Sequence, residues 1–409
     1  MFKKEELRLL WPFYLFLFIE HIFGIGSLIW TVYFVQKGFS FTEVGVGMSI
    51  LIVATFLFEV PTGAVADIFG RKTSVAIGFL LMILFAVLAP FIQSFLVLIL
   101  LFTMMGIAIT FRSGAEEAWV IDYLKKQNKK EYIPDFYVKY RSLASAGILL
   151  AGVLLTGILM VFDADETYVL FNHVFFGADF VWFFQAAGIS FALLVLLLFT
   201  KEDFKRKKKK IHLQLLGVLH YSRKGASYIR HHTVLLLVFI SMLLFGLIGG
   251  ILGFAYQPML IELGFELKDF GWMRSLAAVF GILLPFLAKP ALRRYKDIKI
   301  LRFSFILNCI MTLSIIFVAG PIVGLLLLIA LFEIGSFTYP ILNPFIQKKI
   351  PSRMRATITS MQSMVLAIGG AVSTLIAGPL VDVFGARLTI FASAFVFLPV
   401  IWIFFRIKR

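Results

Sequence analysis

The sequence predicts an all-α integral membrane protein with twelve transmembrane helices in two similar six-helix halves. Three observations predict this class. Of 409 residues, 60% are hydrophobic and only 15% are charged, whereas about 25% of a soluble domain is charged. Apolar runs of roughly 20 residues, enough to cross a bilayer, recur along the chain. One long polar segment, residues 201–232, separates six of these runs from the other six.

Each predicted span is an apolar run bounded by charged, glycine or proline residues. The first run follows Met1 and is too long for a cleaved signal peptide, so we expect it to be retained. In chain order the predicted spans are Leu10–Val35, Phe41–Val65, Thr73–Ile92, Phe95–Ile121, Phe136–Phe162, Phe180–Thr200, Thr233–Leu260, Leu267–Ala288, Ile300–Ala319, Pro321–Ile346, Thr357–Val381 and Leu388–Phe405.

The distribution of positive charge predicts the topology. The net charge is +16, and most of the 39 Lys and Arg residues fall in segments on one side of the predicted bilayer. The opposite loops hold only Lys37, Lys268 and Arg387. Cytoplasmic loops are enriched in Lys and Arg, so we expect both termini in the cytoplasm of a multi-pass cell-membrane protein. The basic charge then reports topology, and no nucleic-acid partner is expected.

The predicted domains are an N-terminal six-helix bundle (1–200), a cytoplasmic basic linker with an amphipathic helix (201–232), and a C-terminal six-helix bundle (233–409). The basic run at 205–210 could bind anionic lipid headgroups or simply anchor the topology. A faint repeat relates the two halves. Gly38-Phe39 and Gly45 open the second span, and Gly264-Phe265 and Gly271 open the eighth at the same spacing.

Several kinds of chemistry are not expected. Cys309 is the only cysteine, so no disulfide framework can form within the chain. The sequence has no G-x-x-x-x-G-K-[ST] phosphate loop, no H-E-x-x-H and no G-x-S-x-G. The acidic loop from Asp163 to Asp179, which contains His173, is expected to hold solvated residues rather than a metal site. We therefore expect no enzyme activity, cofactor or metal.

The loop between the second and third spans carries the most specific motif. Residues 63–72 read Gly-Ala-Val-Ala-Asp-Ile-Phe-Gly-Arg-Lys, in which glycine permits the turn and Arg-Lys marks the cytoplasmic side. The pattern resembles the signature loop of the major facilitator superfamily. Segments 59–63, 113–122 and 351–357 are similar to bacterial drug:proton antiporter-like members. The Gly-Pro motif of antiporters is absent from the fifth span, which leaves antiport or symport open.

The resemblance implies two bundles around a central cavity, a monomer, and a gating set at the signature loop. Asp67 would face the N-terminal end of the eleventh span, where the helix dipole favours an anion. Arg71 would pair with Asp122 at the end of the fourth span. These contacts would hold the outward-open state. The expected gating residues are Gly63, Asp67, Gly70, Arg71, Lys72 and Asp122.

Two glutamates inside predicted spans are candidates for the transport site. Glu20 and Glu333 each lie near the middle of a span, where a charge is costly and usually functional. By resemblance, the first and tenth spans line the cavity. Either residue could carry a proton or contact substrate, or could be a structural, hydrogen-bonded carboxyl. Helical spacing adds further cavity candidates, namely Ser27 and Thr31 beside Glu20, and Ser336 and Asn343 beside Glu333.

Arg112 in the fourth span has two open interpretations. Glu116 lies at i+4, the spacing of an intrahelical ion pair. Alternatively, Arg112 is a cavity-facing cation that binds an anionic substrate or gates Glu20. His21 is expected on a different helix face, as a packed residue.

These features predict a secondary active transporter that works by alternating access, with proton-coupled efflux of lipophilic or amphipathic small molecules as the first hypothesis. The alternative is a proton symporter that imports a small polar or anionic metabolite through Arg112. A non-transporting membrane sensor and a membrane-embedded enzyme are the remaining hypotheses. The expected partners are a small-molecule substrate, protons and the lipid bilayer.

Overall fold

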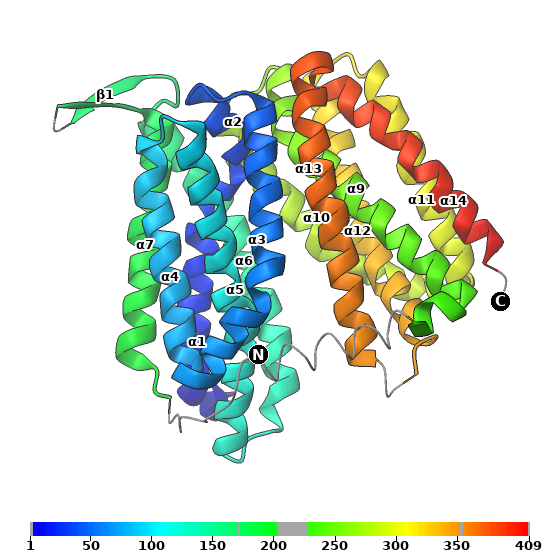
Figure 1. Ribbon diagram of the computed structural model, residues 1–409, viewed down its shortest axis with the longest axis horizontal. Coiled ribbons are helices and arrows are strands. Elements are labelled where there is room, and N and C mark those ends of the chain that lie inside the picture. The colour runs from blue at the N-terminus through cyan, green and yellow to red at the C-terminus, as the bar shows by residue number, and fades with distance from the viewer. Residues whose placement is uncertain (1–2, 171, 203–226, 352–354, 408–409) are drawn as a thin grey trace. The chain divides into compact units, whose positions relative to one another are not determined.

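The structure is a computed structural model that describes residues 3–170, 172–202, 227–351 and 355–407 (Figure 1). Its elements are α1 (Lys4–Phe23), η1 (Ile25–Leu28), α2 (Trp30–Gln36), α3 (Phe41–Phe69), α4 (Arg71–Leu88), η2 (Ala89–Phe91), α5 (Phe95–Lys126), α6 (Tyr132–Val161), β1 (Thr167–Leu170), β2 (His173–Phe176), α7 (Gly177–Phe199), α9 (Thr233–Glu262), α10 (Leu267–Arg294), α11 (Asp297–Ser314), η3 (Ile315–Phe317), α12 (Pro321–Gln347), α13 (Arg355–Ser393), η5 (Ala394–Val396) and α14 (Phe397–Arg406).

Within the described residues, eleven helical segments are long and apolar enough to cross a membrane. The last of them runs from Thr357 to Arg406 and contains both of the final two predicted spans. α13 passes through Gly385, whose φ of 78° and ψ of 169° are not helical. The chain therefore turns at Gly385, without a longer loop between the two spans. The predicted all-helical, membrane-spanning class is confirmed.

The first span differs from the prediction because it is not one continuous helix. α1 ends at Phe23, and the chain continues as η1 and α2. Gly26 N donates a hydrogen bond to Gln185 Oε1 on α7 at 2.8 Å instead of extending the helix. Helical spacing beyond Phe23 therefore no longer applies. The argument that placed Ser27 and Thr31 on the same face as Glu20 was wrong for this reason.

The acidic loop before α7 contains a short β-hairpin that the sequence analysis missed. β1 and β2 are antiparallel, with Thr167 opposite Phe176 and Leu170 opposite His173. Asp179 anchors the base of the hairpin, because its carboxylate accepts from Phe176 N at 2.8 Å and from the Tyr33 hydroxyl at 2.6 Å.

The chain forms two compact units. Unit 1 comprises residues 1–33, 54–211 and 267–278, and unit 2 comprises 34–53, 212–266 and 279–409. α3 and α10 thus contribute their first turns to one unit and their remainder to the other. The predicted division into 1–200, 201–232 and 233–409 stays a prediction, and the expected amphipathic helix, up to residue 226, lies outside the described residues.

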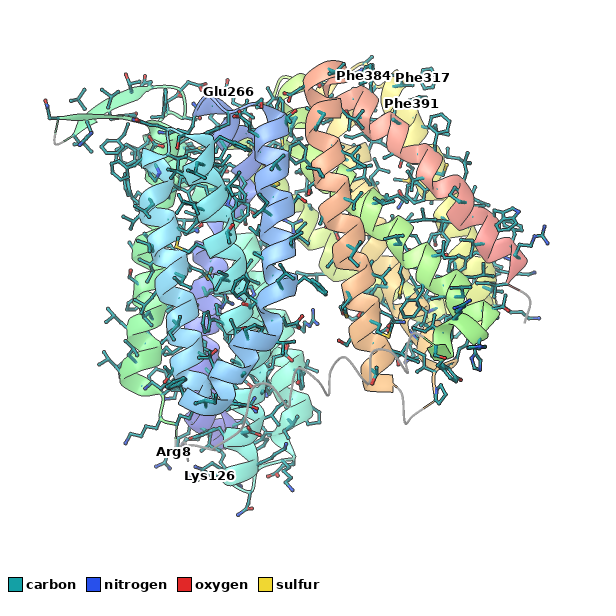
Figure 2. All side chains as sticks on the ribbon, in the orientation of Figure 1. Arg8, Lys126, Glu266, Phe317, Phe384 and Phe391 are labelled. Atoms are coloured by element: carbon teal, nitrogen blue, oxygen red, sulfur yellow. The ribbon has the colours of Figure 1, made fainter. Side chains whose placement is uncertain are left out.

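Each unit has an apolar core and an apolar exterior. In unit 1, Trp182 packs against the rings of Tyr33 and Phe85. In unit 2, Phe317 and Phe384 project outward with exposures of 84% and 57% (Figure 2). Large aromatic side chains in such positions need an apolar environment, which the lipid bilayer supplies. The charged Arg8 and Lys126 instead gather at one end of unit 1.

Candidate functional site

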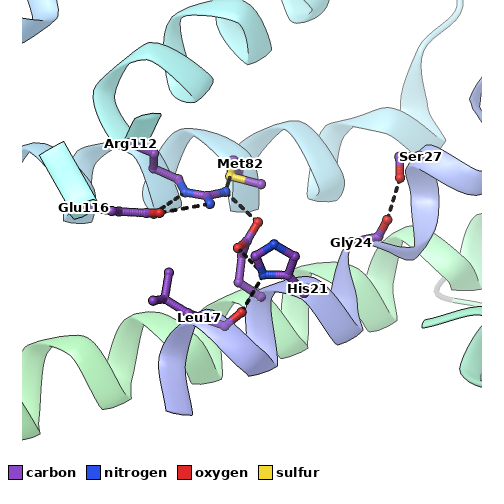
Figure 3. Close-up of polar contacts among 8 residues, drawn as sticks. Leu17, His21, Gly24, Ser27, Met82, Arg112 and Glu116 are labelled. Atoms are coloured by element: carbon purple, nitrogen blue, oxygen red, sulfur yellow. Dashed lines mark hydrogen bonds and ion pairs between the residues drawn. The ribbon is translucent and has the colours of Figure 1, made fainter. Parts of the chain in front are cut away.

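A buried ionic cluster in unit 1 joins α1 to α5. Arg112 Nη1 lies 2.6 Å from Glu20 Oε1, and Arg112 Nε lies 2.6 Å from Glu116 Oε1 (Figure 3). The three side chains are between 6% and 14% exposed. The intrahelical pair between Arg112 and Glu116 is confirmed, and Arg112 also contacts Glu20. We call Glu20, His21, Arg112 and Glu116 the unit 1 cluster.

The remaining surface of the guanidinium is also occupied. Met82 Sδ lies 3.2 Å from Arg112 Nη1, and the Phe79 ring centroid lies 5.1 Å from the guanidinium carbon. Gly78 on α4 makes this position possible, because a Cβ there would lie 2.7 Å from Arg112 Cγ. α4 therefore provides both the space and an aromatic face for the cation.

His21 belongs to the same cluster, which corrects the expectation that it lies on a separate face. Its Nδ1 is 3.1 Å from Glu20 Oε2 and 2.7 Å from Leu17 O. A carbonyl oxygen only accepts, so the contact with Leu17 favours a proton on Nδ1, directly beside Glu20. The ring bends back along its own helix, so residue spacing alone could not have placed it.

Glu20 Oε2 is the least satisfied polar atom of the cluster. It is buried, and no described residue gives it a hydrogen bond of good geometry. Glu20 and Glu116 carry two negative charges against the one positive charge of Arg112. With His21 neutral, the unit 1 cluster therefore has one uncompensated negative charge inside a membrane protein.

The signature loop folds as its glycine pattern indicates. α3 ends at Phe69, Gly70 has a φ of 101°, and α4 starts at Arg71. Positive φ at this point favours glycine. Arg71 Nη2 lies 3.0 Å from Asp122 Oδ2 on α5, which confirms the predicted ion pair.

Sequence reasoning missed the main partner of this loop, Glu202. Its two carboxylate oxygens accept from Arg71 N and Lys72 N, each at 2.7 Å. Lys72 Nζ in turn donates to Leu197 O and Thr200 O at the end of α7. Glu202 satisfies N–H groups that a helix start leaves without partners. The only sequence signal was an acid between an apolar run and a basic one.

The gating role of all six predicted signature-loop residues stays a prediction. Asp67 lies in the last turn of α3 and is half-buried, and Gly63 lies one turn earlier. The predicted contact of Asp67 with the N-terminal end of α13 joins different units, and it stays a prediction.

Glu333 lies in unit 2, on α12, and is 7% exposed. Ser336 Oγ donates to Glu333 Oε2 at 2.9 Å, as the spacing predicted. Gly281 on α10 faces the same carboxylate, since a Cβ there would lie 2.6 Å from Oε2.

Glu333 lines a cavity of about 870 Å³ between α10, α11 and α12. Its walls are largely apolar, with Lys299 as the other charged residue among those that line it. Asn343 lies instead on a second cavity of about 510 Å³. The predicted polar face of α12 is therefore divided between two cavities.

The chain has the construction of a membrane transport protein, with apolar spans packed around buried ionic residues. The sequence pattern described as Major Facilitator Superfamily matches residues 9–374, and the chain belongs to this family. It is therefore a transporter rather than an enzyme.

Other relatives agree with this assignment. The chain is 24% identical over 390 residues to the uncharacterized MFS-type transporter YxaM of Bacillus subtilis (strain 168), covering 92% of this chain and 90% of that protein. Two solved structures share the fold. The nucleoside transporter NupG aligns with a TM-score of 0.75 at 16% identity, over 98% of this chain and 100% of that one. A D-xylose-proton symporter aligns with a TM-score of 0.72 at 12% identity, over 98% of each chain.

Proposed function

We propose that this transporter is secondary active, works by alternating access, and exports lipophilic or amphipathic small molecules in exchange for protons. The proposal is supported by the negative charge that the unit 1 cluster carries when His21 is neutral. A buried charge without a partner is costly. One proton on Glu20, Glu116 or His21 would neutralise the cluster. Glu20 Oε2 is the acceptor that lacks a well-aligned donor, so we assign it the coupling role.

The contacts of Arg112 favour export over import of an anion. Its Nε and Nη1 are bound by carboxylates at 2.6 Å, and Nη2 lies 3.5 Å from Glu116 Oε2. A substrate carboxylate or phosphate would have to displace Glu20 or Glu116 to reach it. The protein itself offsets this cation, and no substrate anion is needed for that purpose.

The cavity that Glu333 lines supports a lipophilic cation as the preferred substrate class. A volume of about 870 Å³ falls within the usual range of small-molecule sites, roughly 300–1,000 Å³. The apolar walls suit aromatic or aliphatic groups. The Glu333 carboxylate would attract an amine or other cation inside a low-dielectric cavity.

Transport into proteoliposomes under an imposed pH gradient tests the proposal, because the sign of the gradient separates the two mechanisms. An antiporter accumulates substrate when the lumen is acidic, whereas a symporter does so when the lumen is alkaline. The panel should contain tetraphenylphosphonium, a neutral lipophile and a small organic anion. We expect accumulation of tetraphenylphosphonium with an acidic lumen.

Glu333→Gln should raise the concentration of tetraphenylphosphonium needed for half-maximal transport. Glu166→Gln is the matched control, since Glu166 lies before β1 and contacts neither site. Accumulation of the anion with an alkaline lumen, without movement of the cation, would refute export and support the import hypothesis.

A further inference from the structure

The signature loop has a second copy in this chain, between the last two spans. Residues 378–387 read Gly-Pro-Leu-Val-Asp-Val-Phe-Gly-Ala-Arg, and residues 63–72 read Gly-Ala-Val-Ala-Asp-Ile-Phe-Gly-Arg-Lys. Glycine, aspartate, phenylalanine and glycine recur at identical spacing. Asp382 thus corresponds to Asp67, and Gly385 corresponds to Gly70. We call residues 378–387 the second loop.

The two loops also share an unusual backbone geometry. Gly70 has φ 101° and ψ 153°, and Gly385 has φ 78° and ψ 169°. Each glycine ends one helical segment and starts the next. Other residues rarely adopt positive φ, so this match extends beyond sequence similarity to the path of the chain.

Each loop is held by one glutamate that binds two consecutive amides. In unit 1, Glu202 accepts from Arg71 N and Lys72 N. In unit 2, Glu262 at the end of α9 accepts from Ala386 N, and also from Arg387 N at 3.1 Å. Both glutamates therefore cap the helix that begins after the glycine.

A basic side chain completes each copy by binding the end of a neighbouring element. Lys72 Nζ donates to Thr200 O at 2.7 Å, just after α7. Arg387 Nη1 donates to Val318 O at 2.7 Å, just after η3. The second loop therefore repeats the signature loop in its glycine, its glutamate partner and its cation.

The aspartate of the second loop, Asp382, binds the start of α3. Asp382 Oδ1 accepts from Phe41 N at 3.0 Å, and Asp382 Oδ2 accepts from Thr42 N at 2.7 Å and from Thr42 Oγ1 at 2.5 Å. The carboxylate thus caps the first turn of α3, where both free amides and the helix dipole favour an anion.

The helices at this contact approach closely. A Cβ on Gly45 would lie 2.6 Å from Thr374 O, and a Cβ on Gly378 would lie 2.5 Å from Phe41 O. Glycine on both sides therefore permits backbone contact between α3 and α13. We call this contact, with Asp382, the α3–α13 seam.

Unit 1 contains an equivalent seam between α6 and α10. A Cβ on Gly271 would lie 2.1 Å from Gly152 O. Thr156 Oγ1 accepts from Trp272 N at 3.0 Å and donates to Lys268 O at 2.9 Å. Gly271 is the repeat counterpart of Gly45, so both seams are formed by the first turns of corresponding helices.

We infer that the second loop is a second gating motif, in which Asp382 and Glu262 are positioning residues that hold the α3–α13 seam closed. The inference rests on the proposed alternating-access cycle, but on neither proton coupling nor substrate. Asp67 and Thr42 lie at opposite ends of α3, about 38 Å apart at 1.5 Å per residue. With the N-terminus in the cytoplasm, the second loop acts at the outer face and the signature loop acts at the inner face. Each loop opposes the state that the other stabilises.

Cysteine labelling at the seam tests this inference. Ser49 is 8% exposed and lies one turn beyond Gly45 on the same face of α3. In a Cys309→Ser, Ser49→Cys background, a membrane-impermeant maleimide added to intact cells should react slowly, because the seam covers this position. Loss of a capping side chain removes enough free energy to change a population by roughly 2- to 30-fold. Asp382→Ala should raise the labelling rate by such a factor.

Asp382→Asn keeps the side-chain volume and loses the charge, so it should raise the labelling rate by a smaller factor. This variant provides the test if Asp382→Ala does not reach the membrane. Glu262→Gln should also raise it. Asp67→Ala should lower it, because loss of the inner contact favours the outward-closed state. Glu166→Ala, just before the hairpin on the same predicted face, is the control and should leave the rate unchanged.

The inference is wrong if Asp382→Asn labels at the rate of the control, or if the Asp67 and Asp382 variants shift the rate in the same direction. The labelling needs no substrate and no pH gradient. Failure of proton-coupled export in proteoliposomes would therefore leave this result intact, and failure here would leave the export proposal standing.

Discussion

Arg112 Nη1 and Glu20 Oε1 lie 2.6 Å apart, although the two residues are 92 positions apart in the sequence. The contact places an ion pair between α1 and α5, next to the pair that Arg112 makes within its own helix. One guanidinium thus serves two carboxylates, and the three groups must be considered together. Removing any one of them changes the charge balance of the other two.

Arg112→Gln should destabilise the protein strongly, because it leaves Glu20 and Glu116 buried without their cation. Breaking a buried ion pair on one side typically costs about 3–5 kcal/mol. A thiol-reactive dye that reports exposure of buried Cys309 would measure the fall in apparent melting temperature in detergent.

The matched control neutralises all three groups. Glu20→Gln, Arg112→Met and Glu116→Gln together remove the charges while keeping similar volumes, so they should restore most of the lost stability without restoring coupling. A melting temperature for Arg112→Gln equal to that of the wild type would show that the cluster is not the buried ionic unit described above.

Glu20→Gln should uncouple transport from protons. Gln keeps the shape of the side chain but cannot take up a proton, so accumulation driven by an acidic lumen should disappear. Exchange of labelled for unlabelled substrate across the membrane needs no proton and should persist. Glu333→Gln should instead weaken substrate binding while the pH gradient still drives accumulation. If Glu20→Gln accumulates substrate as the wild type does, Glu20 is not the coupling residue.

At the signature loop, Glu202 should contribute more to local order than Asp122. The Asp122 side chain is 54% exposed, and exposed ion pairs contribute only about 0–1 kcal/mol. Glu202 instead binds two helix-start amides, a role comparable to a capping residue worth about 0.5–2 kcal/mol. Hydrogen exchange in peptides covering residues 68–76 should therefore accelerate in Glu202→Gln and change little in Asp122→Asn. The reverse order would assign the main stabilising contact to the ion pair.

The sequence predicted the parts of the fold that follow from composition and local pattern. Apolar runs located the spans, because the bilayer thickness sets their length. Gly70 and the adjacent cations located the signature loop. The break after Phe23 was missed because Gln185, far away in the sequence, provides the acceptor for Gly26 N. No pattern within the first span encodes that partner.

For the candidate site, the sequence likewise predicted contacts within one helix but not contacts between helices. The i+4 spacing predicted the pair between Arg112 and Glu116, since both lie on one helix. It could not choose between a substrate and Glu20 for the remaining face of Arg112, because that choice depends on how α1 packs beside α5. The second loop was missed at the sequence level, because only the backbone angles at Gly385 and the contact with Glu262 show that it folds like the signature loop.

Because His21 is closely packed, adding one methyl group beside it tests whether its position matters for coupling. Gly147 on α6 faces the ring, and a Cβ there would lie 2.5 Å from His21 Cβ. Gly147→Ala should displace His21 from Glu20, and such overpacking typically costs about 1–3 kcal/mol. Gly157→Ala on the same helix is the control, because nothing lies within 4 Å of its added Cβ. Alanine there should be neutral or slightly stabilising, since it favours the helix over glycine. We expect Gly147→Ala to melt earlier and to lose part of the transport driven by an acidic lumen, and Gly157→Ala to retain both. Equal behaviour of the two variants would show that the position of His21 does not matter for coupling.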